Sequence, residues 1–507
     1  MMKYSLLFIS LLSQISNIAL AVSPDSIVER CNALTEMKFD NAKVIKSELI
    51  EERFTPLTKL ADTLRGAENN VITGLPQFCR VELAIQPEIN IEIWLPTQWN
   101  HRLQAIGGGG YAGFIPFDEL AVAVKDGYAT VATDTGHQGN LLEGNFVFKN
   151  NQLQADAIAD FAYRSVHEMT IKAKQVIENY YGQMPSFSYW NGCSTGGRQG
   201  LMEAQKFPAD YNGLYITAPA IQWDKFLPSE LWPQIVMQEE LGQPIDLAKL
   251  DKVRQAIINL ADEQDGIKDG IIDDPASLEI TDEFLKQQGL NNNEIVALRK
   301  IWQGPTTKTG QFLWYGIEPT AQTDALAGST PFPIPVDYLK YWINQNPTVD
   351  WKQLGYKGFE NYFNDSVDLY RPIIGTDNAD LSQFKHLGGK MIIWHGWDDK
   401  LIPPKGTIHY YNRVLKIMGG QSDTDEFLKL YMAPGVDHCK GGEGADRING
   451  FQSLVNWVEN KQPPTTLTAQ KIEKGQITLQ RPLCPYPQKT VYKGKGDTNN
   501  PTNFECQ

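Results

Sequence analysis

The sequence has fewer basic than acidic residues, few cysteines and few histidines. Lysine and arginine total 46 against 60 aspartate and glutamate residues, which gives a formal net charge of −14. Proteins that bind nucleic acids or anionic membranes need a basic surface, so this balance argues against both kinds of partner. Hydrophobic residues make up 42% of the chain and charged residues 21%, which excludes a disordered or fibrous protein.

Long apolar runs are confined to the N-terminus. Lys3 precedes a mostly apolar stretch that ends in Ala19-Leu20-Ala21. A basic start, a short apolar core and an A-x-A end are typical of a secretory signal peptide, so we expect residues 1–21 to be removed. A membrane anchor is the alternative, but polar residues interrupt the stretch, and it is short for a span of about 20 apolar residues. The sequence therefore predicts a secreted or periplasmic protein.

The six cysteines form no C-x-x-C pair, which argues against a zinc ribbon or a thioredoxin-like redox site. An even number of cysteines in an exported chain indicates disulfides, although buried free thiols are the alternative and the pairing stays open. The cysteines are Cys31, Cys79, Cys193, Cys439, Cys484 and Cys506.

Strand and helix patterns occupy two parts of the chain. The first part carries predicted strands at residues 81–85, 90–95, 103–106, 128–133, 187–190 and 214–217, and helices at 156–181 and 201–207. The pattern lapses in a stretch rich in Trp, Tyr and Pro and resumes with strands at 391–394 and 427–432 and a helix at 450–458. Strands that alternate with helices predict a mostly parallel sheet domain, residues 22–221 and 372–507, with residues 222–371 inserted as a lid.

The sequence Gly192-Cys193-Ser194-Thr195-Gly196 matches the pattern G-x-S-x-G. A predicted strand precedes it and a helix follows from Arg198. The nucleophile of an α/β hydrolase sits on this kind of sharp strand-to-helix turn. A glycine-rich turn that contains serine by chance is the alternative, but the flanking elements favour Ser194 as a nucleophile.

A serine hydroxyl needs a base to take its proton, and in α/β hydrolases the acid and then the histidine follow the serine in the chain. His438 comes shortly after the last predicted strand and is the expected base. The acid should follow the preceding strand, where Asp398 and Asp399 both qualify by position. We interpret His395, at the end of that strand, as a structural histidine.

Two cysteines flank the predicted serine and histidine. Cys193 immediately precedes Ser194, and Cys439 immediately follows His438. If the serine and the histidine meet, their neighbouring cysteines come close as well. The sequence therefore predicts a disulfide between Cys193 and Cys439 that ties the nucleophile to the base.

The oxyanion of an acyl-transfer reaction needs fixed N–H donors. The Thr195 amide, just after the nucleophile, is one expected donor, and Gly109 or Gly110 in the glycine run after an early strand is the other. The same run, Gly108-x-Gly110-x-x-Gly113, formally matches a dinucleotide-binding fingerprint, with Asp134 at a suitable distance for a ribose contact. That alternative leaves the serine, aspartate and histidine unexplained.

Within the insertion, Asp262, Asp265 and Asp269 alternate around Asp-Gly turns. Hard oxygen ligands at this spacing suit calcium, although Ile267 stands where an EF-hand needs Asp or Asn. Two solvated turns are the alternative. The insertion also carries many Trp, Tyr and Phe residues, most of which we expect in the core of the lid and a few in contact with an aromatic substrate.

Together these motifs resemble the tannase and feruloyl esterase family. The resemblance covers nearly all of the mature chain and is carried by residues 192–200, 107–110 and 395–403 and by His438-Cys439. It implies an α/β-hydrolase fold with a large inserted lid and a disulfide between the cysteines beside the serine and the histidine. In the family pattern the acid stands three residues before Ile-Pro, which implies Asp399.

The resemblance also implies one structural calcium ion in the lid. Its expected ligands are the side chains of Asp262, Asp265 and Asp269 and the backbone carbonyls of Ile267 and Ile271.

The family pairing further implies the disulfides Cys31–Cys79 and Cys484–Cys506. One departure concerns the calcium loop, where members often carry an extra disulfide and this chain has Ala261 and Ala276 instead.

For function, the resemblance implies a secreted serine esterase that acts on small aromatic esters without an organic cofactor. Its members cleave esters of hydroxyaromatic acids such as gallate, ferulate and chlorogenate, and some bacterial members cleave mono(2-hydroxyethyl) terephthalate. A peptidase or amidase is an alternative within the hydrolases. A non-catalytic protein that binds phenolics or carbohydrates is a further alternative, which a complete set of serine, histidine and aspartate disfavours.

Overall fold

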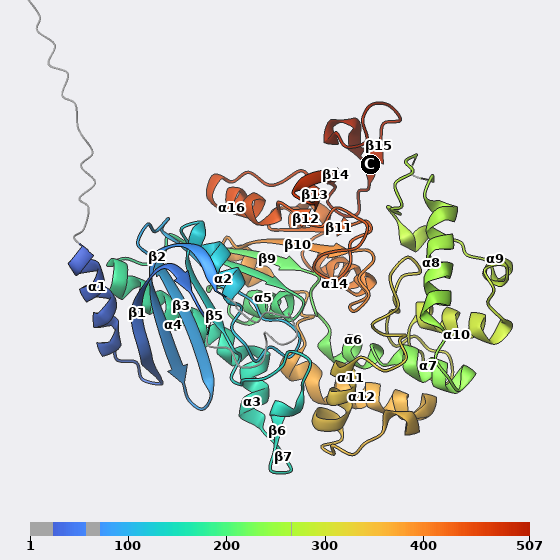
Figure 1. The fold of residues 1–507 in the computed structure, drawn as a ribbon, viewed down its shortest axis with the longest axis horizontal. Helices are drawn as coiled ribbons and strands as arrows, with labels where there is room; N and C mark the ends of the chain where they lie inside the picture. Colours follow the sequence, from blue (N-terminus) through green and yellow to red (C-terminus); the bar gives the residue numbers. More distant parts are fainter. Residues whose placement is uncertain (1–23, 57–70, 265) are drawn as a thin grey trace, which may run out of the picture.

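The computed structural model of the chain describes residues 24–56, 71–264 and 266–507, so the expected signal peptide lies outside the described residues. Its central sheet consists of β1 (Ala42–Phe54), β2 (Ile72–Ile85), β3 (Ile89–Pro96), β4 (Arg102–Ile106), β5 (Ala129–Thr133), β8 (Phe187–Cys193), β9 (Gly213–Thr217), β10 (Lys390–Gly396) and β11 (Leu428–Ala433). Neighbouring strands follow the order β1-β2-β3-β5-β4-β8-β9-β10-β11 (Figure 1).

Most of this sheet is parallel, as the alternation of strands and helices predicts. Strands β5, β4, β8, β9, β10 and β11 pair in parallel, and β1, β2 and β3 join one edge in antiparallel pairing. Parallel neighbours cannot be joined by a tight turn, so each connection crosses over the sheet and places a helix or a longer segment on one face.

Helices cover both faces of the sheet. On one face α4 (Ser165–Tyr181), α5 (Thr195–Lys206) and α14 (Pro404–Ile417) bury apolar side chains against the strands. On the other face α2 (Phe117–Lys125) and α16 (Gly450–Asn460) do the same. The helix expected over residues 156–181 is interrupted: α3 (Ala155–Ala159) and a π-helical turn, Asp160–Arg164, precede α4.

The expected insertion contains a block of helices, drawn from green to yellow in Figure 1. They are α6 (Trp223–Ser229), α7 (Trp232–Leu241), α8 (Leu247–Ala261), α9 (Asp282–Gln287), α10 (Asn292–Gln303), α11 (Pro333–Asp337) and α12 (Gly355–Ile374). The block buries Trp232, Tyr338 and Trp342 in a hydrophobic cluster that also includes Tyr111 and Phe161 of the sheet domain. Because β9 precedes the block and β10 follows it, the block occupies the connection between two adjacent parallel strands.

Several elements have no clear signal in the sequence. Strand β1 lies at the sheet edge, where exposed charged residues break the alternation of apolar and polar positions. The hairpin of β13 (Leu467–Glu473) and β14 (Gln476–Leu483) is likewise mostly solvent-facing. The other short elements are α1 (Pro24–Ala33), β6 (Phe148–Lys149), β7 (Gln152–Leu153), α13 (Ser382–His386), α15 (Gln421–Asp425), β12 (Arg447–Ile448), β15 (Thr490–Tyr492) and β16 (Phe504–Cys506). Among the described residues, no helix is both long and apolar enough to cross a membrane.

All six cysteines form disulfides, and the predicted pairing is confirmed. The bridges join Cys31 to Cys79, Cys193 to Cys439 and Cys484 to Cys506. The second bridge closes a sequence separation of 246 residues, and the third a separation of 22 residues.

These two loops differ in the stability that their bridges should provide. In the chain-entropy model, the longer loop contributes roughly 5 kcal/mol to the free energy of unfolding and the shorter loop about 3 kcal/mol. We therefore expect the double variant C193A/C439A to lose more stability than C484A/C506A. Guanidinium unfolding followed by circular dichroism measures both losses. A greater loss in C484A/C506A would contradict the loop-length argument.

Candidate active site

Ser194 lies at the turn between β8 and α5. Its backbone has φ 61° and ψ −122°, a conformation that residues other than glycine rarely adopt. The Ser194 N–H donates to the Thr217 carbonyl at 3.0 Å, and the Ser194 carbonyl accepts from the Ala220 N–H at 3.1 Å. These bonds to the end of β9 hold the strained turn that was expected for a nucleophile.

The two glycines of the G-x-S-x-G sequence are required by close backbone contacts at this turn. A Cβ on Gly192 would lie 2.5 Å from the Gly196 carbonyl oxygen, and a Cβ on Gly196 would lie 2.9 Å from the Gly108 carbonyl oxygen. The pattern therefore reflects a turn packed tightly against the loop of residues 107–110.

Asp399 and His438 contact each other across two loops that follow neighbouring strands. His438 Nδ1 lies 2.7 Å from Asp399 Oδ2. The other oxygen of Asp399 accepts the backbone N–H groups of Leu401 and Ile402, each at 2.9 Å. With the Asp399 carboxylate fully buried, His438 Nδ1–H is the natural donor, which leaves Nε2 free to accept a proton.

The structure separates the two aspartates that the sequence left open. Asp398 accepts a hydrogen bond from Thr320 Oγ1 of the insertion at 2.6 Å, whereas Asp399 contacts the imidazole of His438. Burial raises the pKa of Asp398 to about 6. Only Asp399 is placed to orient the histidine, in agreement with the position that the family resemblance implies.

Asp399 and His438 each stabilise the charged form of the other. Burial alone would raise the pKa of Asp399, but His438 and His395 beside it lower that pKa well below its usual value. Burial would lower the pKa of His438, and the Asp399 carboxylate outweighs this effect and raises it. A positive charge that forms on His438 is therefore stabilised by a carboxylate that stays ionised.

His395 also contacts the Asp399 carboxylate, beside His438, and the sequence reasoning did not predict this contact. The residue is fully buried, and its Nε2 lies 2.9 Å from Asp399 Oδ2 while its Nδ1 lies 2.8 Å from Thr407 Oγ1. The interpretation as a structural histidine stands, with a specific partner. The tight turn between His395 and Asp399, four residues apart at a strand end, is the sequence signal that could have indicated this contact.

The loop of residues 107–110 presents backbone amides beside Ser194. The Gly107 N–H donates to the Asn191 carbonyl at 2.9 Å, and the Gly108 N–H donates to Gln199 Oε1 at 3.0 Å. Within the described part of the chain, the amides of Gly109, Gly110 and Thr195 have no protein acceptor. The Thr195 hydroxyl also donates to the Gly110 carbonyl at 2.6 Å, which joins this loop to the serine turn.

A cavity of about 550 Å³ connects these groups with the insertion. Ser194 and His438 line the cavity together with Trp223, Phe226 and Phe332 of the insertion. A few aromatic side chains of the insertion therefore face the cavity, as expected, while most form its core. A flat apolar ring bound beside Ser194 would contact these aromatic residues.

Glu230, between α6 and α7, also lines this cavity and was not predicted. The residue is 4% exposed, and its Oε2 has no hydrogen-bond partner among the described residues. Burial and the nearby Asp399 raise the pKa of Glu230 well above its usual value. A raised pKa favours the protonated form of the carboxyl, which carries one O–H donor. A single acidic residue within the apolar stretch of residues 226–237 is the only sequence signal for it.

In the loop after α8 the carboxylate of one expected calcium ligand, Asp262, contacts the backbone of another, Asp269. Asp262 Oδ1 accepts the backbone N–H groups of Asp269 at 3.1 Å and Gly270 at 2.6 Å. One oxygen of Asp269 accepts the Ile271 N–H at 3.1 Å, and the other pairs with Arg481 at 2.6 Å. Asp265 lies outside the described residues.

Solved structures of two fungal esterases have the same fold. Feruloyl esterase B from Aspergillus oryzae has a TM-score of 0.83 at 26% identity, covering 95% of this chain and 100% of that one. Tannin acyl hydrolase from Aspergillus niger has a TM-score of 0.79 at 23% identity, covering 95% and 94%. The expected α/β-hydrolase fold is confirmed.

The sequence itself also matches known proteins. Residues 70–507 match the family model described as tannase and feruloyl esterase. A probable feruloyl esterase from Arthroderma benhamiae is 36% identical over 451 residues, 84% of this chain and 83% of that protein. A mono(2-hydroxyethyl) terephthalate hydrolase from Piscinibacter sakaiensis is 29% identical over 528 residues, 85% of each chain. The chain therefore belongs to the tannase and feruloyl esterase family, as its motifs predicted.

Proposed function

We propose that this esterase hydrolyses esters of hydroxyaromatic acids, such as ferulate or gallate, through an acyl-enzyme on Ser194. The observation that carries the proposal is the 2.7 Å contact between Asp399 and His438, in a cavity that Ser194 and aromatic side chains of the insertion also line. Relatives named feruloyl esterases support the substrate class.

The proposed reaction has two steps. His438 Nε2 takes the Ser194 proton as the serine oxygen attacks the ester carbonyl, and the imidazolium then gives that proton to the departing alcohol. A water molecule, deprotonated by the same histidine, then attacks the acyl carbonyl, and the imidazolium returns the proton to Ser194 as the serine–acyl bond breaks and the aromatic acid leaves. Asp399 orients the imidazole and stabilises its positive charge. The amides of Thr195 and of Gly109 or Gly110, which have no protein acceptor, are the proposed donors to the oxyanion.

Replacing the three proposed catalytic residues should abolish turnover without unfolding the protein. We expect Ser194→Ala and His438→Ala to lower kcat by ~10⁴- to 10⁶-fold. Asp399→Asn should be far more damaging than Asp398→Asn, because only Asp399 contacts His438. Steady-state kinetics with methyl ferulate and labelling of Ser194 by a fluorophosphonate measure these effects. Equal losses in Asp398→Asn and Asp399→Asn would refute the assignment of the acid.

The charge distribution in the cavity favours hydroxylated over carboxylated rings. The titratable side chains among its lining residues are Glu119, Glu230, His438 and Lys440, and Lys440 is exposed. A terephthalate monoester would bring its carboxylate beside two acidic side chains, Glu119 and Glu230, and an ionised acid there would repel it. A ring hydroxyl can instead form a hydrogen bond with Glu230 Oε2, as acceptor if the carboxyl is protonated and as donor if it is ionised. We therefore propose hydroxycinnamate and hydroxybenzoate esters as substrates, with a terephthalate monoester as the alternative.

Glu230 is expected to set this preference. Glu230→Leu removes the proposed hydrogen bond to the ring hydroxyl, so it should lower kcat/KM for methyl ferulate or methyl gallate by about tenfold. It should change kcat/KM for methyl cinnamate much less, because that ester has no ring hydroxyl. Glu119→Gln, a change at an exposed position on the same cavity, serves as the control and should alter neither value.

The substrate panel also contains a terephthalate monoester and a butyrate ester. Wild-type preference for butyrate would show that the aromatic side chains are only lid core. Preference for the terephthalate ester would overturn the proposed role of Glu230.

We also propose one structural calcium ion in the insertion. Asp262, Asp265 and Asp269 would supply carboxylate oxygens, and Ile267 and Ile271 would supply backbone carbonyls. Two observations support this donor set: the Asp262 carboxylate contacts the backbone of Asp269 in one loop, and Gly266 and Gly270 give the loop its positive φ angles of 88° and 77°. Arg481 would share Asp269 with the ion.

Calcium bound only by the folded state raises its stability by mass action. We therefore expect the chelator EGTA to lower the Tm, added Ca²⁺ to restore it, and Mg²⁺ to have little effect. Asp262→Asn should remove the response to EGTA, whereas Asp274→Asn, a change at a nearby carboxylate outside the proposed set, should retain it. An unchanged Tm in EGTA, together with no calcium by elemental analysis, would rule the site out.

We further propose that the chain is exported with residues 1–21 removed. Three disulfides support an oxidising compartment. Expression with the complete N-terminus should yield a mature chain that begins at Val22, as measured by mass spectrometry of the exported protein. Retention of Met1 in the exported protein would contradict this.

A further inference from the structure

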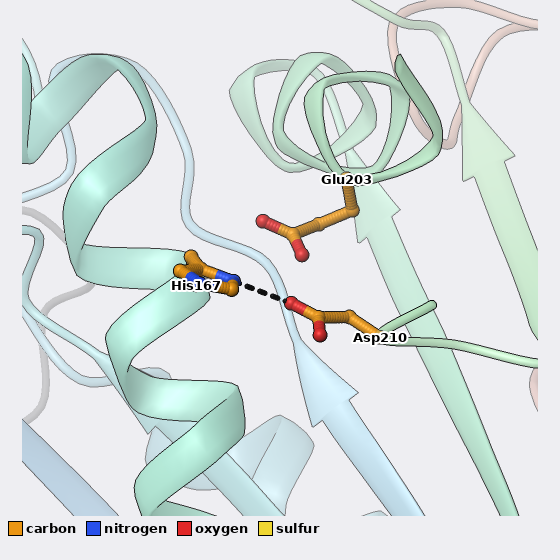
Figure 2. Close-up of side chains that lie close together, drawn as sticks. All are labelled: His167, Glu203 and Asp210. Atoms are coloured by element: carbon orange, nitrogen blue, oxygen red, sulfur yellow. Dashed lines mark hydrogen bonds and ion pairs between the residues drawn. The ribbon is translucent and has the colours of Figure 1, made fainter. Parts of the chain in front are cut away.

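Three titratable side chains meet on the sheet face that α4 and α5 cover. They are His167 of α4, Glu203 of α5 and Asp210 of the loop before β9, and Figure 2 shows all three turned toward a common centre. Each offers one ligand atom, and these atoms all lie within 4.8 Å of one another. Glu203 is nine residues along α5 from Ser194, or about 13 Å at helical rise, so the cluster is separate from the catalytic cavity.

Glu203 is the residue that needs explanation. It is 1% exposed, and neither of its carboxylate oxygens has a hydrogen-bond partner among the described residues. Its carboxylate points between His167 and Asp210 (Figure 2). A buried carboxylate without a partner is costly, so the arrangement calls for a cation or a proton at this point. Burial and the adjacent Asp210 also raise the pKa of Glu203 well above its usual value.

The other two side chains are held in place and remain accessible. His167 Nδ1 lies 2.7 Å from Asp210 Oδ2, and the imidazole stacks on Phe207 with ring centroids 3.7 Å apart. The side chains of His167 and Asp210 are 27% and 13% exposed, which gives an ion a route from solvent. Lys174 contacts the cluster through the backbone carbonyl of Asp210, so its ammonium does not occupy the carboxylates.

We propose that His167, Glu203 and Asp210 bind a divalent transition-metal ion of the Zn²⁺ type. One imidazole nitrogen and two carboxylate oxygens form a three-ligand set that suits Zn²⁺, with water as the fourth ligand, whereas Ca²⁺ and Mg²⁺ prefer oxygen ligands alone. Two carboxylates balance the charge of the ion. Small side-chain movements would bring the ligand atoms to the ~2.0–2.2 Å that Zn²⁺ requires, with the imidazole nitrogen exchanging its contact with Asp210 for the metal.

Such an ion would join α4 to α5 and to the loop that leads into β9. Helix α5 begins directly after Ser194, and β9 carries the Thr217 carbonyl that holds the serine turn. The ion would therefore brace, from the far end of α5, the elements that position the nucleophile. Its role would be structural, since it does not reach the reacting atoms.

The test uses Zn²⁺ and Co²⁺ added to the purified full-length enzyme in excess Ca²⁺, so that the loop after α8 does not contribute. We expect Zn²⁺ to raise the Tm and Co²⁺ to produce the visible absorption of a low-symmetry, nitrogen- and oxygen-ligated site. Glu203→Gln and His167→Gln should weaken binding at least ~100-fold, given that losing even an outer-shell partner of a ligand costs 10–100-fold. Glu178→Gln, a change at an exposed position of α4, should bind as the wild type does.

The outcomes separate a metal from a proton on Glu203. If Zn²⁺ and Co²⁺ leave the wild type unchanged, or act equally on Glu203→Gln, the proposal is wrong. A proton on Glu203 would also make Glu203→Gln as stable as the wild type in the absence of metal, because the amide replaces a neutral acid. Circular dichroism of each variant establishes that it is folded before metal is added.

Discussion

The hydrogen bond between Asp399 and His438 depends on two parallel strands ending side by side. Strands β10 and β11 pair in register from Met391 with Leu428 to Gly396 with Ala433, so the loops after them begin at the same edge of the sheet. Asp399 lies three residues beyond β10 and His438 five residues beyond β11, which lets short loops bring them together. The Cys193–Cys439 bridge then ties the histidine loop to the serine turn at the end of β8. The loops that carry Ser194, Asp399 and His438 thus come together because the sheet fixes where each loop begins.

Two residues of this arrangement would destabilise the folded protein if they had no partners. Ser194 has a strained backbone, and Asp399 is fully buried as a charge. Each is stabilised by several independent partners: the serine turn by bonds to the end of β9, and Asp399 by two backbone N–H groups and two imidazoles. Strained or charged positions persist when surrounding structure over-determines them, and the large sheet core provides that structure.

The sequence predicted the parts of the site that depend on local patterns. Ser194 follows from a strand, a glycine-flanked turn and a helix, and the Cys193–Cys439 pair follows from the cysteines beside the serine and the histidine. Choosing between Asp398 and Asp399 from the residues alone was impossible, because both follow β10 and only the backbone turn decides which faces His438. Strand β1 was missed because an edge strand has little apolar periodicity. Glu230 was missed because its importance comes from the cavity that distant segments form around it.

The residues proposed to catalyse the reaction and those proposed to choose the substrate lie on different parts of the chain. Ser194, Asp399 and His438 lie on loops of the sheet body, whereas Trp223, Phe226 and Glu230 come from the insertion between β9 and β10. The insertion can change its cavity-lining side chains without disturbing the register of β10 and β11. Such a division is consistent with relatives of similar sequence whose names give different substrates, a feruloyl ester in one and a terephthalate ester in another. Near the acid the two parts are joined by the Thr320–Asp398 hydrogen bond and by the ion pair between Lys400 and Asp324. Through these contacts the insertion touches the residues on both sides of Asp399, so a shift of the insertion would act on the loop that holds the proposed acid.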